Sequence, residues 1–386
     1  MKAARILLAL AFVGGAGAFF LHVMTRDDAA AVHGRQTEKE LPPTGRKPML
    51  LETSASCRPC HPEVYAEWSR SHHAIAYTNP EVQRLSRQFQ DRDCLPCHLP
   101  RPVFETGLGV RVLERSTRKN EGVDCFTCHR SGNAMLCAGE VGPGGADAPC
   151  NPETWAPVAS MTLCAPCHDQ HKVLQDWKQT RFAVEGPGYQ DCNDCHMPRV
   201  KRAQGRSGRG HVFPGAHDPE MIRKAATMQV TLGGSGLLLV RVENTGAGHN
   251  FPADERHRAV DLEIEVEDGS GRSARFRVDR YRNPYREEFA IKNPLREPGA
   301  ERDYEVEIQG LGTAAIHALR VPAEHQPHRK TWYPESTQIP AGEARSYRIE
   351  LPAEVRSARV LLLFRTNPYQ SDEDAVLVAE EKVSLR

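Results

Sequence analysis

The residues most able to do chemistry lie between positions 57 and 196, where the pattern Cys-x-x-Cys-His occurs five times. Each copy places two thiols three residues apart, with an imidazole directly after the second thiol. Two thiols at this spacing can add to the two vinyl groups on one edge of a porphyrin, and the histidine that follows can bind the iron from one face. The pattern therefore predicts covalent attachment of haem c at each copy.

The predicted cofactor content is five haems c. The thiols that would attach them are Cys57, Cys60, Cys94, Cys97, Cys125, Cys128, Cys164, Cys167, Cys192 and Cys195. The proximal iron ligands would be His61, His98, His129, His168 and His196. A zinc ribbon or a disulfide framework would use the cysteines but would leave the histidine after every pair unexplained.

The second axial ligand decides what each iron can do. A bis-His haem is six-coordinate and transfers electrons with little rearrangement, whereas a five-coordinate haem can bind a small substrate. Removing the five proximal residues from the 17 histidines leaves 12. Five of these lie in favourable surroundings as distal ligands: His73, His171, His211, His217 and His249. His72 is the alternative to His73, and Met161 is an alternative ligand of another type. Met197 directly follows its own proximal ligand His196 and cannot reach the far face of that haem, so we interpret it as a packing residue.

Composition limits the function classes and the compartment. The formal net charge is zero, so nothing points to nucleic acid as a partner. Hydrophobic content is 39% and aromatic content 6%, which is too little for an ordinary core in the cysteine-rich region. Five haems would supply the missing apolar mass. Because haem is attached to thiols outside the cytoplasm, we expect the periplasm or the cell surface.

The chain divides into four predicted segments. Residues 1–26 contain an uncharged run from Ile6 to Met24 after Lys2 and Arg5, which predicts a membrane anchor or a signal peptide; its length favours an uncleaved anchor in the cytoplasmic membrane. Residues 27–50 read as a flexible linker, and residues 51–222 as the pentahaem domain. The clearest helix there is predicted from Glu63 to Ala76.

Residues 223–386 contain no cysteine and show alternating apolar and polar positions. This pattern predicts an all-β domain of immunoglobulin-like sandwich type, after a mostly helical or irregular haem domain. The predicted strands are Met228–Glu243, Val260–Glu267, Arg275–Val278, Tyr304–Ile308, Ala344–Leu351, Ala358–Phe364 and Ala375–Val383. His257, His317, His325 and His328 read as ordinary residues of this domain.

Two cysteines lie outside the five copies. Cys137 and Cys150 bracket a loop rich in Gly, Pro and Ala. In an oxidising compartment a disulfide is the simplest interpretation, and a pair of free thiols is the alternative.

These features resemble the multihaem c-type cytochromes related to hydroxylamine oxidoreductase and the tetrahaem cytochrome of nitrifying bacteria. The resemblance rests on Trp68-x-x-Ser71-x-His73-Ala74, on Cys192-x-x-Cys195-His196-Met197-Pro198, and on His211-x-Phe213-Pro214-Gly215. The loop Gly246–Pro252, which contains His249, is similar to a loop in members with a C-terminal β-domain. In that family such histidines bind haems from the opposite side, and the haems pack in stacked and perpendicular pairs.

The sequence departs from the family in three ways. Phe182 stands in the fourth repeat where the first repeat has His73, so His171 or His217 would serve as ligand or one haem would stay open. No copy has lysine in place of the proximal histidine, unlike the catalytic haem of pentahaem nitrite reductase. The eight haems of hydroxylamine oxidoreductase are also absent.

We therefore expect an extracytoplasmic pentahaem electron-transfer protein, rather than an enzyme. Its redox partners would be a membrane quinol-oxidising donor or other cytochromes. Two alternatives remain at this stage: an oxidoreductase that acts on a small nitrogen or sulfur compound at one open haem, and a structural subunit that passes electrons inside a larger complex.

Overall fold

The structure is a computed structural model. It describes residues 42–45, 47–142, 145–170, 172–234, 236–253, 258–283, 302–308, 312–321, 336–367 and 370–385. The predicted anchor or signal segment and most of the predicted linker lie outside these residues. Within the described part, no helix is both long and apolar enough to cross a membrane.

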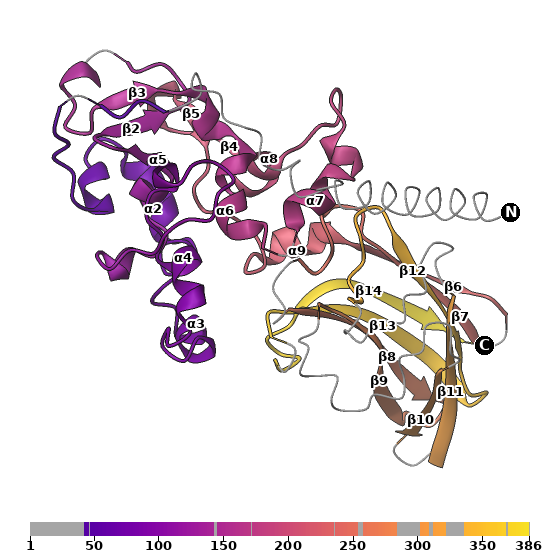
Figure 1. Cartoon of the computed structure of the whole chain (residues 1–386). Helices are drawn as coiled ribbons and strands as arrows, with labels where there is room; N and C mark the ends of the chain where they lie inside the picture. The colour runs from indigo at the N-terminus through magenta and orange to yellow at the C-terminus, as the bar shows by residue number, and fades with distance from the viewer. Residues whose placement is uncertain are drawn as a thin grey trace, which may run out of the picture.

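The N-terminal part, up to Ala225, consists of short helices and irregular chain with two small sheets (Figure 1). A proline at the first or second position begins five of the helices, α2, α3, α4, α6 and α9, since this position needs no backbone donor. The helices are α2 (Pro62–Ser69), α3 (Pro80–Leu85), α4 (Leu95–His98), α5 (Cys125–His129), α6 (Ala165–His168), α7 (Val173–Lys178), α8 (Cys192–His196) and α9 (Pro219–Ala225). The strands are β1 (Arg130–Ser131), β2 (Ala134–Cys137), β3 (Pro152–Thr154), β4 (Arg199–Lys201) and β5 (Ser207–Arg209).

Helix α2 ends earlier than the sequence pattern predicted. The prediction ran to Ala76, but the helix stops at Ser69. The Ser71 hydroxyl donates to Trp68 O at 2.7 Å and accepts from Ala74 N at 3.3 Å, so a side chain replaces the next helical hydrogen bonds. The chain turns here, and the turn carries His72 and His73.

The C-terminal part is all β, as predicted, and forms two antiparallel sheets. One sheet has the order β10-β11-β12-β7-β6 and the other β14-β13-β8-β9. The strands are β6 (Thr227–Leu232), β7 (Leu237–Glu243), β8 (Ala259–Asp268), β9 (Ser273–Tyr281), β10 (Arg302–Ile308), β11 (Gly312–Val321), β12 (Ala344–Glu350), β13 (Val355–Arg365) and β14 (Val376–Ser384). The finer immunoglobulin-like assignment stays a prediction.

The two sheets share one apolar core. Residues from both, such as Leu238 and Val240 of β7 and Leu262 and Ile264 of β8, are fully buried in the same cluster. Ile222 of α9 belongs to this cluster, so the last helix of the N-terminal part packs on the sheets. Figure 1 places α7 and α9 where the helical and β parts meet.

Two strand predictions need correction. The predicted strand Met228–Glu243 is a hairpin of β6 and β7, because the glycine-rich stretch after Leu232 interrupts the apolar pattern and the chain reverses there. Strand β11 was missed because its alanine-rich sequence has few β-branched residues.

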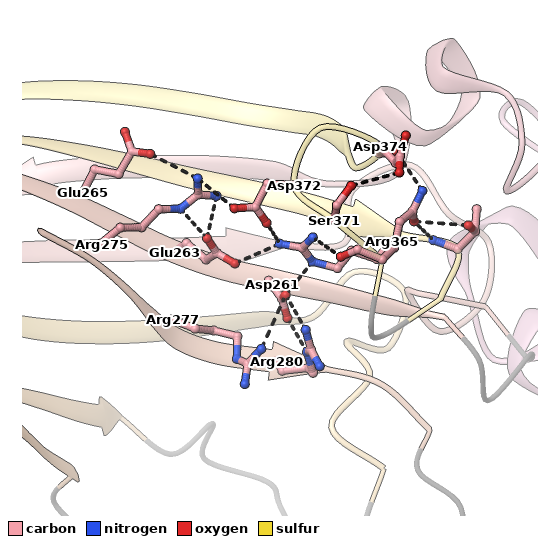
Figure 2. Close-up of polar contacts among 12 residues, drawn as sticks. Asp261, Glu263, Glu265, Arg275, Arg277, Arg280, Arg365, Ser371, Asp372 and Asp374 are labelled. Atoms are coloured by element: carbon pink, nitrogen blue, oxygen red, sulfur yellow. Dashed lines mark hydrogen bonds and ion pairs between the residues drawn. The ribbon is translucent and has the colours of Figure 1, made fainter.

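The outer face of the β14-β13-β8-β9 sheet carries a continuous network of ion pairs (Figure 2). Its centre is Asp261, which is fully buried and receives Arg280 at 2.5 Å and Arg365 at 2.7 Å. Arg365 also contacts Glu263 at 3.1 Å and pairs with Asp372. Burial alone would raise the pKa of Asp261, but the hydrogen bonds and charges of these arginines outweigh it and lower the pKa.

Replacement of Asp261 by asparagine is expected to lower the free energy of unfolding by about 3 kcal/mol at pH 7, because Arg365 stays buried with one partner less. The pKa of Asp261 is lower in the folded than in the unfolded state. Its contribution is therefore present above the unfolded pKa of about 3.9 and is lost as the pH falls through the folded value. Denaturant unfolding followed by circular dichroism should show the difference at pH 7 and a smaller one below about pH 4.

The matched control is Glu380→Gln, which removes a solvent-accessible pair with Arg359 and should change the free energy of unfolding much less. Equal effects of the two substitutions would contradict a special role for the buried carboxylate.

Candidate haem-binding site

The five Cys-x-x-Cys-His motifs, numbered 1 to 5 in chain order, all lie at or within short helical turns. Motifs 3 and 5 coincide with α5 and α8, motifs 2 and 4 end on α4 and α6, and motif 1 leads into α2. A helical turn places residues i, i+3 and i+4 on one side, so both thiols and the imidazole face the same region. Side-chain caps fix two of these helices: Asp124 accepts from Thr127 N at 2.9 Å, and Asp191 forms a capping box with Asp194.

The motif thiols are partly buried, except that of Cys60, which is exposed. Burial raises the pKa of Cys128 to about 12 and that of Cys192 to about 11, and it raises the pKa of Cys164 further still. Cys125 is the exception, because a hydrogen bond with Cys57 lowers its pKa. A thioether carries no charge, so conversion of these thiols to thioethers matches an environment that disfavours thiolates.

Three motif histidines each face one predicted distal histidine. The ring centroids are 6.1 Å apart for His73 and His168, 6.3 Å for His129 and His211, and 6.4 Å for His196 and His249. Two imidazoles bound on opposite sides of one metal, with metal–nitrogen bonds of about 2 Å and ring centres about 1.1 Å beyond each nitrogen, have centroids about 6.3 Å apart. The spacing in all three pairs therefore fits an iron between the rings.

Backbone carbonyls select the nitrogen that is left for a metal. Nδ1 hydrogen-bonds a carbonyl in both members of the motif 3 and motif 5 pairs; a carbonyl only accepts, so Nδ1 carries the proton and Nε2 keeps its lone pair. The acceptors are Leu136 for His129, Arg209 for His211, Pro214 for His196 and Asn250 for His249, at 2.7–3.0 Å. His98 of motif 2 has the same bond to Ala76 O at 2.8 Å.

Two of the proposed distal ligands, His73 and His211, are also neutral. Burial lowers the pKa of His73 to about 3, and the neighbouring His168 adds to this effect. Burial likewise lowers the pKa of His211 to about 4. A neutral imidazole is the form that binds iron, so these environments fit axial ligands.

His73 is placed by the chain segment next to motif 3. Val123 N donates to His73 O at 2.8 Å, and Trp68 Nε1 donates to Val123 O at 2.9 Å. Gly122 adopts a φ of +52°, and a β-carbon there would lie 2.3 Å from His73 O. Only glycine allows this close approach.

His249 lies on the loop between β7 and β8, and both parts of the molecule hold this loop. Asn244 is fully buried and donates through Nδ2 to His249 O at 2.8 Å and to Ile339 O at 2.9 Å. Asn250 Nδ2 donates to Asp176 of α7 at 2.8 Å. The β part therefore supplies the histidine that faces motif 5.

Other predicted residues lie elsewhere. The ring of His217 stacks on His72 at 3.7 Å and 15°, which is too close for both to bind one iron from opposite sides. His171 lies outside the described residues, although its neighbour Gln170 donates to Cys97 of motif 2 at 2.9 Å. Phe182 packs beside the His249 loop, 3.5 Å from the position that a β-carbon of Gly248 would occupy.

The predicted Cys137–Cys150 disulfide is wrong, because both residues are free thiols. The strand register explains the separation. Cys137 is opposite Thr154, whereas Cys150 O accepts from Met135 N, two residues earlier along β2. Cys137 Sγ instead donates to Gly139 O at 3.3 Å.

The zinc alternative also fails on geometry. Among the residues that the structure describes, no three or more His, Cys, Asp or Glu side chains form a group that could hold a metal ion. The thiol pairs therefore do not combine as a zinc ribbon requires.

Sequence reasoning missed the residues that place the ligands. These residues contact the backbone of the proposed distal ligands: Glu67 that of His211, Asn244 that of His249, and Gly122 that of His73. They are distant in sequence from the ligand or belong to common residue types. No local pattern marks them, since their role exists only after the chain folds.

Comparison with known proteins finds a family for part of the chain. Residues 56–130, which contain motifs 1 to 3, match the sequence model of the family described as cytochrome c554 and c-prime. This match supports a multihaem c-type cytochrome, to which this part of the chain is similar. The same similarity supports haem, iron and electron transport as properties of the chain.

The fold of this chain is also found in a solved structure. A penta-haem cytochrome c552 from Thermochromatium tepidum aligns with a TM-score of 0.58 and 16% sequence identity, over 88% of this chain and 100% of that chain. At this identity the likeness shows a shared fold. No curated protein matches the sequence.

Proposed function

We propose that this cytochrome binds five haems c, mostly with two histidines per iron, and transfers electrons between redox partners outside the cytoplasm. The thiol pairs and proximal histidines of motifs 1 to 5 would hold the haems, and His211, His73 and His249 would be the distal ligands at motifs 3, 4 and 5. Each bound haem supplies one reversible electron at its iron. The relation to hydroxylamine oxidoreductase stays a prediction.

The observation that carries this proposal is the spacing of the three histidine pairs. Each pair joins a motif histidine to a candidate distant in sequence, and all three spacings lie within 6.1–6.4 Å. Two ligands on one iron hold it six-coordinate in both redox states, which favours electron transfer over substrate binding.

Contacts between thiols of different motifs support a connected haem chain. A hydrogen bond links Cys57 of motif 1 with Cys125 of motif 3, and another links Cys97 of motif 2 with Cys167 of motif 4. Cys192 of motif 5 lies close enough to raise the pKa of Cys164 in motif 4. Haems attached to such neighbouring sulfurs would have their edges close together.

The proposed compartment rests on the chemistry of attachment. Because haem is attached to thiols outside the cytoplasm, we place the protein in the periplasm or at the cell surface, tethered by residues 1–26 to the cytoplasmic membrane. The partners would be a membrane quinol-oxidising donor or other cytochromes.

Electron paramagnetic resonance of the oxidised full-length holoprotein tests the proposal. Low-spin signals are expected for at least the three haems of motifs 3 to 5, because each has two imidazole ligands. Carbon monoxide added to the reduced protein should leave these three spectra unchanged. High-spin signals from three or more haems would contradict the proposal.

A second candidate function rests on motifs 1 and 2. Within the described residues no ring contact pairs His61 or His98 with another histidine, and His217 stacks on His72. If motif 1 or 2 holds a five-coordinate haem, it is the place for an oxidoreductase acting on a small nitrogen or sulfur compound. Binding of one equivalent of carbon monoxide, lost on substitution of His61 or His98, would favour this function.

A further inference from the structure

Helix α2 carries two glutamates one turn apart, and each pairs with an arginine next to the β4–β5 hairpin. Glu63 pairs with Arg206 at 3.2 Å, and Glu67 pairs with Arg202 at 2.7 Å. The first pair is exposed, with 36% and 48% of the side chains accessible, whereas the second is mostly buried, with 16% and 9%. Both carboxylates therefore pair with an arginine, but the Glu63 pair is exposed to solvent and the Glu67 pair is mostly buried.

Glu67 also contacts a proposed iron ligand. Its Oε2 accepts from His211 N at 2.9 Å and lies 4.0 Å from His211 Nδ1. Arg202 Nη2, which binds the same carboxylate oxygen, donates to Arg209 O at 2.7 Å, and this carbonyl accepts from His211 Nδ1 at 3.0 Å. Glu67 and Arg202 therefore hold both the backbone and the ring of His211.

A charge at this position acts on the iron through the ligand. A carboxylate close to an axial imidazole makes the imidazole more electron-rich and stabilises the ferric over the ferrous state. Its field is strengthened by burial, because the local dielectric is lower than in water. Glu63 lies on the surface, where its carboxylate accepts from Ala203 N and from the Arg206 side chain. Within the described residues it contacts no histidine, so it lacks this path.

We propose that Glu67 is a positioning residue for His211 and lowers the reduction potential of the haem at motif 3. The helix that follows motif 1 would then set the potential of the haem at motif 3, which is its neighbour through the Cys57–Cys125 contact. This inference rests on the proposed coordination of that haem by His129 and His211.

The test compares Glu67→Gln with Glu63→Gln in the full-length holoprotein. Spectroelectrochemical titration of Glu67→Gln should show one haem with about a tenfold higher ferrous-to-ferric ratio at a fixed potential, which is ~59 mV for one electron. A loss of one low-spin signal with new carbon monoxide binding would equally support positioning by Glu67. Glu63→Gln should leave every potential and signal unchanged. Equal behaviour of the two variants would overturn the proposal.

Two further variants test the role of Glu67 and the coordination by His211 if Glu67→Gln folds poorly. Arg202→Gln leaves the Glu67 charge less compensated and should shift the same haem to a more negative potential; a positive shift would overturn the proposal. His211→Ala should convert one haem to high spin. If the spin state does not change, the proposed coordination at motif 3 is wrong, and the role of Glu67 is wrong with it. If the spin state changes but Glu67→Gln and Glu63→Gln give equal titrations, only the role of Glu67 is wrong.

Discussion

Replacement of His249 by alanine is expected to convert one haem from low spin to high spin and to add one equivalent of carbon monoxide binding per protein. His249 faces His196 at 6.4 Å with its ring within 10° of parallel, and its Nδ1 proton is held by Asn250 O. Alanine leaves the distal side of the motif 5 haem without a ligand but with space for one. Electronic absorption and paramagnetic resonance of the purified holoprotein measure the change.

Imidazole in solution provides the control for His249→Ala. If the variant retains its fold, added imidazole should occupy the vacated position and restore the low-spin spectrum. A variant with the same number of low-spin haems as the wild type would show that the β part does not supply a ligand to motif 5.

Replacement of Gly122 by alanine is expected to displace His73 and open the haem at motif 4. The new β-carbon would lie 2.3 Å from His73 O and 2.7 Å from Ala76 N, and both are backbone atoms that cannot rotate away. The expected result is one additional high-spin haem, together with carbon monoxide binding at that haem. A loss of stability of at least about 1 kcal/mol should accompany it, from the left-handed backbone alone.

Gly109 is the matched control for Gly122. It also has a left-handed backbone, with φ of +72°, but no atom lies within 4 Å of the position of its β-carbon. Gly109→Ala should therefore lower stability by a similar backbone cost and leave all haem spectra unchanged. Loss of a low-spin haem in both variants would show that strain, and not displacement of His73, is the cause.

The proximal haem sites could be predicted from sequence because their chemistry is local. Covalent attachment and proximal ligation need residues within five positions of each other. A single short segment such as Cys192–His196 therefore contains all of them. Helical turns then follow, since only a turn brings the residues of α8 to one side.

The distal ligands could be predicted only as candidates. His211 and His249 lie far from His129 and His196 in sequence, and the tertiary fold alone decides which pairs meet. The same limit explains His217, which has similar sequence surroundings to His211 but stacks on His72.

The predicted ends of helices and strands were wrong where side-chain hydrogen bonds or turns interrupt an element despite the apolar periodicity of the sequence. Ser71 ends α2 by binding Trp68 O, although the apolar spacing continues. The β6–β7 turn lies inside what was predicted as one strand, at the glycine-rich stretch after Leu232. The all-β character of the C-terminal part was nevertheless predictable, because alternation along strands such as β7 and β12 reflects burial of one face of the sheet.

The central claim is that ten thiols of this chain attach five haems. Mass spectrometry of the intact, denatured holoprotein tests it most directly, because covalent haem survives unfolding and a ligated but unattached haem does not. We predict the mass of the polypeptide plus five haems. A mass equal to that of the bare polypeptide, or to the polypeptide with fewer than five haems after complete maturation, would contradict the account.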